Sequence, residues 1–187
     1  MKKFLYYLVY FVVAIAPFTL ASCGGDDDDD EPSLDNGGAG SDNITLTING
    51  KSYTFTAGLV GAAGGGNIVE LWNWKNNYMN DWIVFGFPKL DNLEEGYTFP
   101  YYTNRNDDLT FSVMSLEGED ESNLFSGLVS GTVKVEKVTA GTITISFSNT
   151  IFDASYFDGL YGDKSFRISG RMTLPTYVER WGKQPFE

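Results

Sequence analysis

The sequence predicts an all-β domain: an antiparallel meander of about eight strands that forms a sandwich or an up-and-down barrel. Several short runs alternate apolar and polar residues at the two-residue period of a strand with one face in water. Turn signals separate these runs at regular spacing. No segment shows a capped apolar stripe at helical spacing, so a plan that mixes helices with a parallel sheet is disfavoured.

The clearest element is a hairpin where the domain begins. Ile44, Leu46 and Ile48 alternate with threonines, and Asn49-Gly50 follows. Asn-Gly supplies the two residues of positive φ that a type I′ turn needs. A two-residue loop then sets Ile48 opposite Lys51, Leu46 opposite Tyr53 and Ile44 opposite Phe55, so both strands place their apolar residues on one face.

The rest of the domain predicts six further strands and several connections. The strands are expected at Ile68 to Trp74, Trp82 to Phe87, Leu109 to Val113, on both sides of the turn Thr139-Ala140-Gly141 within Gly131 to Ser148, and at Phe166 to Leu174. Ala57 to Gly66 contains five glycines and predicts a flexible loop. Asp91 to Asp108 predicts a long turn-rich loop, and loops of that length are often functional.

The first residues have the layout of a secretory signal. Lys2 and Lys3 precede an apolar run from Phe4 to Phe18, which is near the short end of what spans a bilayer and has no basic cluster after it. Leu20-Ala21-Ser22-Cys23 resembles the lipobox of bacterial lipoproteins. That resemblance implies cleavage before Cys23, a diacylglyceryl group on its thiol and acylation of the new amine, with the membrane as partner through the anchor.

An acidic run follows the predicted lipidation site: Asp26, Asp27, Asp28, Asp29, Asp30 and Glu31. It resembles the export signal that some Gram-negative gut bacteria place behind the lipid cysteine of surface lipoproteins. It is also what a solvated, self-repelling tether would contain. We therefore expect a signal peptide at residues 1–22, a lipidated cysteine and disordered tether at 23–42, and a single β domain at 43–187, in the outer membrane and facing the exterior.

Charge and composition exclude several classes of function. The chain has 13 basic and 25 acidic residues, and the domain from residue 43 keeps 11 basic against 17 acidic ones, a net charge of −6. Nucleic acid is therefore a poor partner, because phosphate binding needs a basic face. The chain has no histidine and a single cysteine, which excludes Ser-His-Asp and Cys-His catalysis and ordinary zinc sites.

Carboxylate chemistry is the remaining route to catalysis or metal binding. Adjacent acids such as Glu94-Glu95 or Asp107-Asp108 are typical of solvated turns, since neighbouring side chains point apart. Asp153, Asp158 and Asp163 are spaced by five residues and do not match a calcium loop. We expect no catalytic residue, no metal and no cofactor.

Aromatic residues are the most suggestive feature for binding. The candidates are Trp72, Trp74, Tyr78, Trp82, Tyr101 and Tyr102. Trp72 and Trp74 project from the same face of one strand, so they are either core or a platform for stacking on a sugar. Asn73, Asn76, Asn77 and Asp81 lie among them and could recognise hydroxyls. The tyrosines, on predicted loops, are the better surface candidates.

The strand pattern of Gly131 to Phe152 and Phe166 to Met172 resembles that of small, mostly uncharacterised surface lipoproteins with a lipocalin-like (calycin-like) β domain. The resemblance implies a lipocalin-like barrel more than any activity. Three functions stay open: a glycan-binding or other ligand-binding module, an accessory lipoprotein that binds an envelope protein, and a lipocalin-like carrier of a small apolar molecule. Outward, clustered tryptophans would favour the first, and tryptophans around an internal cavity the last.

Overall fold

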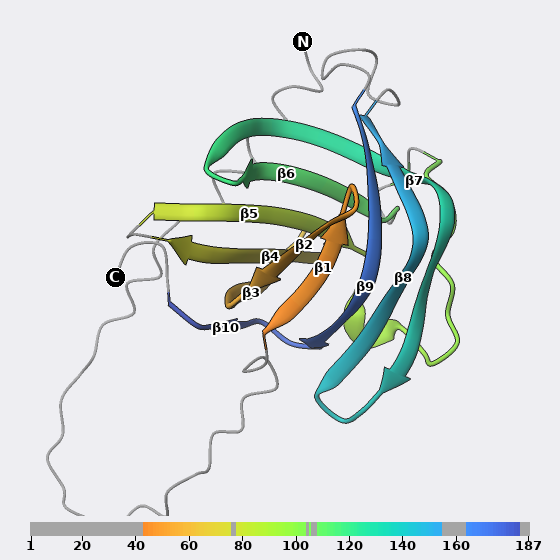
Figure 1. Ribbon diagram of the computed structural model, residues 1–187. Coiled ribbons are helices and arrows are strands. Elements are labelled where there is room, and N and C mark those ends of the chain that lie inside the picture. The colour runs from red at the N-terminus through yellow and green to blue at the C-terminus, as the bar shows by residue number, and fades with distance from the viewer. Residues whose placement is uncertain (1–42, 76–77, 104, 106–107, 155–163, 184–187) are drawn as a thin grey trace, which may run out of the picture. The chain divides into compact units, whose positions relative to one another are not determined.

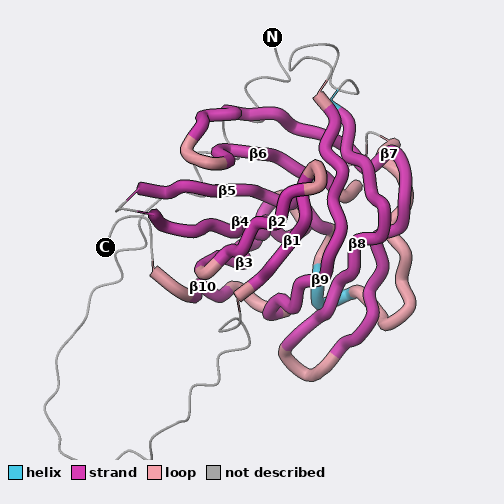
Figure 2. The backbone as a smooth tube through the Cα atoms, in the orientation of Figure 1, coloured by secondary structure: helices cyan, strands magenta, loops and turns pink. Residues whose placement is uncertain are grey.

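The computed structural model describes residues 43–75, 78–103, 105, 108–154 and 164–183 (Figure 1). The predicted signal peptide, Cys23, the acidic run and the tether lie outside the described residues. The strands are β1 (Ile44–Ile48), β2 (Lys51–Phe55), β3 (Ala57–Ala63), β4 (Gly66–Lys75), β5 (Tyr78–Phe87), β6 (Thr110–Leu116), β7 (Glu119–Val138), β8 (Thr142–Asp153), β9 (Ser165–Pro175) and β10 (Glu179–Trp181). A short 3-10 helix, η1 (Leu90–Asn92), follows β5 (Figure 2).

All ten strands belong to one antiparallel sheet that curls into a half-barrel (Figures 1 and 2). Their order is β10-β3-β4-β5-β6-β7-β8-β9-β1-β2. Only Thr56 separates β2 from β3, and its N–H donates to the Trp72 carbonyl at 3.1 Å, so the chain itself links the β2 end of this order to β3, the second strand from the other end. The predicted all-β antiparallel class is confirmed, with ten strands in place of about eight.

The first hairpin has the predicted register. Ile44 pairs with Phe55, Leu46 with Tyr53 and Ile48 with Lys51. Asn49 and Gly50 have φ values of 50° and 83°, as the type I′ turn requires. Local turn chemistry and the apolar pattern therefore specify the same pairing.

The glycine-rich segment was wrongly predicted to be a flexible loop, because Ala57 to Ala63 forms β3 and Gly66 begins β4. The glycines allow close approach within the sheet. A Cβ at Gly58 would lie 2.7 Å from the Glu70 carbonyl oxygen and would overlap the ring of Trp181, and a Cβ at Gly66 would overlap the Phe87 carbonyl. Only a residue without a side chain fits these positions.

The long connection between β5 and β6 packs against the sheet. Phe99 N–H donates to the Val133 carbonyl at 3.0 Å, and Val135 N–H donates to the Tyr97 carbonyl at 2.8 Å, which fastens the connection along β7. Leu93 and Phe99 belong to the core. Asp108 closes the far end by accepting the N–H groups of Thr103 and Arg105, both at 2.7 Å.

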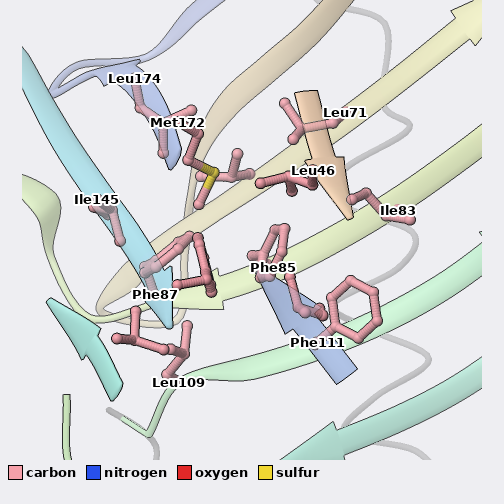
Figure 3. Close-up of a cluster of buried hydrophobic side chains, with 14 of the residues drawn as sticks. Leu46, Leu71, Ile83, Phe85, Phe87, Leu109, Phe111, Ile145, Met172 and Leu174 are labelled. Carbon is pink, nitrogen blue, oxygen red and sulfur yellow. The ribbon is translucent and has the colours of Figure 1, made fainter. Parts of the chain in front are cut away.

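The core lies inside the curl and is rich in phenylalanine (Figure 3). The ring centroid of Phe85 lies 4.9 Å from that of Phe111, 5.4 Å from that of Phe147 and 6.3 Å from that of Phe152. Aliphatic side chains such as Leu46, drawn from β1, fill the space beside the rings (Figure 3). The two-residue alternation of each strand supplies this core from one face only.

Candidate binding surface on β4 and β5

Strand alternation places three tryptophans on the outer face of the sheet. In β4 the side chains of Val69 and Leu71 enter the core, and in β5 those of Ile83, Phe85 and Phe87 do so. The opposite face therefore carries Ile68, Glu70, Trp72 and Trp74 of β4, together with Trp82 and Val84 of β5. We call Trp72, Trp74 and Trp82 the tryptophan set.

The tryptophan set is held together by register and by one shared acceptor. Trp72 pairs directly with Trp82 across β4 and β5. The indole N–H groups of Trp72 and Trp74 both donate to the Lys183 carbonyl, at 2.9 and 3.0 Å. The Lys183 ammonium lies 5.4 Å from the centroid of the Trp74 ring, within cation–π range. The segment after β10 therefore fixes two of the three indoles.

The three rings differ in how much surface they offer. Trp72 is only 2% exposed, whereas Trp74 and Trp82 are half-buried. The Trp82 Nε1 atom is buried and has no hydrogen-bond partner of good geometry among the described residues. Trp74 is therefore the member of the set best placed to meet a ligand.

Glu70 lies beside the tryptophan set on the same face. Burial raises the pKa of its carboxyl, and this effect outweighs the neighbouring Trp82 N–H and the charge of Arg180, both of which favour the ionised form. Arg180 reaches the outer face two strands away, because it pairs with Leu59, which in turn pairs with Glu70. The surface thus combines aromatic rings with one carboxyl and one guanidinium.

The candidate tyrosines do not join the tryptophan set. Tyr78 is 78% exposed, but it pairs with Lys75, so its side chain projects from the opposite face of the sheet to that of Trp74. Tyr101 is 53% exposed and donates its hydroxyl to the Gly131 carbonyl at 3.3 Å, beside β7. The prediction that Tyr102 is a surface residue was wrong, because its ring packs over Gly127 and only 8% of the residue is exposed.

The polar residues expected around the rings have structural partners. The Asp81 carboxylate accepts the Asn73 amide at 2.6 Å and the Glu117 N–H at 2.7 Å, and the Asn73 amide also donates to the Thr54 carbonyl at 3.0 Å. These bonds fasten β4 and β5 to β2 and to the β6–β7 turn. Asn76 and Asn77 lie outside the described residues.

Sequence reasoning missed the residues that complete the surface. Nothing in the local pattern points to Lys183, because its role is played by a backbone carbonyl. Trp181 was also unassigned; it enters the core over Gly58 and so anchors the segment that ends at Lys183. Glu70 did leave a signal, as the one charge within the apolar run from Ile68 to Trp72.

A separate hollow of about 360 Å³ lies at the β3–β4 turn, lined by residues including Gly65, Pro88 and Leu93. It is at the opposite end of β4 from Trp74. Within the described ranges, no group of three or more acidic or cysteine side chains could hold a metal ion. Two members of the aspartate series, Asp158 and Asp163, fall outside those ranges.

The described part of the chain contains no helix that is long and apolar enough to cross a membrane.

No protein-family model, curated protein or solved structure matches this chain.

Proposed function

We propose that this protein is a lipid-anchored protein of the outer membrane that faces the cell exterior and acts as a non-catalytic binding module. The ligand is a glycan or another extracellular molecule that offers a flat apolar face. The observation that supports this proposal is the outward position of the tryptophan set on β4 and β5. A barrel that only packed its tryptophans would hold them inside the curl.

The fixed indoles favour stacking on a ligand. Trp72 and Trp74 share the Lys183 carbonyl, so their rings are held before a ligand arrives and little side-chain entropy is lost on binding. The half-buried Trp74 ring offers an apolar face, and Arg180 and Glu70 lie on the same outer surface for polar recognition. Aromatic rings with a few placed polar groups are the usual composition of a small-ligand site.

An accessory role as a partner of an envelope protein is the second candidate. The 2% exposure of Trp72 favours it, because a ring so covered offers little surface to a sugar. A lipocalin-like carrier is the weakest of the three. The phenylalanine rings around Phe85 occupy the space inside the curl where a carrier would hold its ligand.

A glycan array read with the soluble chain from residue 24 tests the binding proposal. Trp74→Ala should weaken capture of any bound glycan by roughly tenfold or more, about 1.4 kcal/mol for each factor of ten. Tyr78→Ala and Tyr101→Ala are matched controls, because they remove exposed rings away from the tryptophan set. If a tyrosine variant loses binding while Trp74→Ala keeps it, the site lies elsewhere. If no glycan binds, the accessory role is favoured.

Anchoring and display have separate tests. Cys23→Ser should abolish labelling by a fatty acid fed to cells, since the thiol is the only site for the first acyl group. Replacing residues 26–31 with alanine should keep the label and reduce the amount of protein that a protease removes from intact cells. Equal removal of mutant and wild-type protein would leave the acidic run as a passive tether.

A further inference from the structure

Two uncharged turns meet at one end of the half-barrel. The Thr176 N–H, between β9 and β10, donates to the Gly141 carbonyl in the β7–β8 turn at 3.0 Å. A Cβ at Gly141 would lie 3.6 Å from the Tyr177 ring, in ordinary contact. We call this end, made of residues 138–141 and 176–178, the tip. It lies at the lower end of β8 and β9 in Figure 1.

The tip carries an unusual share of exposed apolar surface. Six large hydrophobic residues are exposed in the described chain, and three of them are here: Val138 at 36%, Tyr177 at 51% and Val178 at 63%. A fourth, Tyr97, lies next to the same end of β7, where its carbonyl accepts the Val135 N–H. Exposed large apolar groups gathered at one place mark an interaction surface more often than scattered ones do.

Charge separates the tip from the opposite end of the domain. Residues 138–144 and 172–178 contain no charged side chain. The opposite end has the Lys51–Glu117 ion pair, and Arg167 lies beside the β1–β2 turn, where its N–H donates to the Asn49 side chain at 2.8 Å. The charges that flank the tip in the sequence balance in sign, because Glu136 and Lys137 precede it and Glu179 and Arg180 follow it. The Glu179 carboxylate accepts a hydrogen bond from the Tyr177 hydroxyl. A neutral, amphipathic tip with tyrosine suits the boundary of a lipid bilayer.

The chain enters the domain at the tip end. β1 runs antiparallel to β9 with Leu46 opposite Gly170 and Ile48 opposite Ile168, so the Ile44 end of β1 points toward Pro175. About three residues of β9, or roughly 10 Å of strand, separate the Ile44 end of β1 from the tip. A tether that runs from residue 24, behind Cys23, to residue 42 therefore joins the domain on the same side as the exposed apolar residues. Its 19 residues reach at most about 60 to 70 Å when fully extended.

We propose that the tip rests on the lipid surface to which the protein is anchored. This inference rests on the proposed anchoring at Cys23. Three or four apolar side chains would bind a free domain to lipid only weakly, but the tether keeps the tip at high effective concentration near the bilayer, so weak contact is enough to orient the domain. The β1–β2 and β6–β7 turns, with their charges, then point away from the membrane.

Site-specific fluorescence on the lipidated full-length mature protein tests the orientation. Val178→Cys and Tyr78→Cys each introduce one thiol at an exposed position. Tyr78 is the matched control, because β5 begins beside the β6–β7 turn, where the Gly118 N–H donates to the Asn80 carbonyl at 2.7 Å. Each variant is labelled with an environment-sensitive dye and reconstituted in vesicles of phosphatidylethanolamine and phosphatidylglycerol that contain a nitroxide-labelled lipid.

The label at residue 178 should be quenched several-fold more strongly than the label at residue 78. Equal quenching at both positions, or stronger quenching at residue 78, overturns the inference, and a tip that captures a protein in place of lipid would give that result. The parent protein, without an added cysteine, monitors the anchor. If Cys23 of the parent reacts with the dye, it carries no thioether-linked lipid, and the anchoring on which the inference rests fails. If Cys23 of the parent does not react, the anchor is present, and the quenching at residues 178 and 78 then tests the position of the tip alone.

Discussion

Gly127 and Tyr102 offer a test of how the long connection packs on the sheet. A Cβ at Gly127 would lie 2.6 Å from the Tyr102 Cβ and 2.9 Å from its Cδ1, where apolar atoms prefer about 3.5 to 4.0 Å. The ring would have to move by about 1 Å to admit a methyl group. Overpacking of this kind costs about 1 to 3 kcal/mol, so Gly127→Ala should lower the free energy of unfolding by that amount.

A double-mutant cycle isolates this contact. Tyr102→Ala alone should cost about 3 to 5 kcal/mol, the range for truncating a buried large aromatic residue. In the Tyr102→Ala background the clash with the ring is gone and only the contact with the Cβ retained at position 102 remains, so the double variant should be more stable than the two single costs predict, by about 1 kcal/mol. Urea unfolding of the chain from residue 24, monitored by tryptophan fluorescence, measures each corner of the cycle.

The control is a glycine whose added Cβ meets only ordinary contact. Gly141→Ala would place its Cβ 3.6 Å from the Tyr177 ring and should change stability by no more than about 0.5 kcal/mol. If the costs of Gly127→Ala and Tyr102→Ala add to within about 0.5 kcal/mol, the two residues do not touch, and Tyr102 is a free loop residue as its sequence position suggests.

Three further predictions concern the turn, the core and the outer face. Gly50→Val places a β-branched residue at a φ of 83° and should cost on the order of 1 kcal/mol or more; an unchanged urea midpoint would exclude the type I′ turn. Phe147→Ala should cost about 3 to 5 kcal/mol because the ring packs 5.4 Å from that of Phe85, and a loss below about 1 kcal/mol would mean that the rings are not packed together. The raised pKa of Glu70 lets the folded state keep a proton that the unfolded chain releases near the ordinary value of 4.5, so the wild type loses stability as the pH rises above that value. Glutamine does not titrate, so Glu70→Gln should gain stability relative to wild type as the pH rises from about 4 to about 7. A wild-type-to-variant difference that stays constant over this range would show that Glu70 is solvated.

Local signals predicted the hairpin fully and β3 not at all, for the same physical reason. Asn49-Gly50 fixes a turn by its own backbone preferences, so a short window contains all the information. The glycines at 58 and 66 are required by the Trp181 ring and the Phe87 carbonyl, which come from distant parts of the sequence. Their composition looks the same as that of a flexible loop, because a short window does not reveal what presses against the missing side chain.

The candidate binding residues divided along the same line. Tyr102 and Tyr101 are neighbours in one predicted loop, yet one ring packs on Gly127 and the other stays exposed. Which of two adjacent aromatic residues is covered depends on where the loop crosses β7. That crossing is set by the hydrogen bonds of Tyr97 and Phe99 to Val135 and Val133, and no local pattern encodes it.

The orientation of the tryptophan set, in contrast, follows from a single charged residue. Both alternating sets of side chains in β4 are largely apolar, so alternation alone does not decide whether Val69 and Leu71 or Trp72 and Trp74 face the core. Glu70 breaks the tie, because an unpaired carboxylate inside a phenylalanine core would cost far more than the exposure of a ring. The side chains on the same face of β4 as Glu70 must therefore point outward, and these include Trp72 and Trp74. The antiparallel register then adds Trp82, the partner of Trp72, to the same outer face.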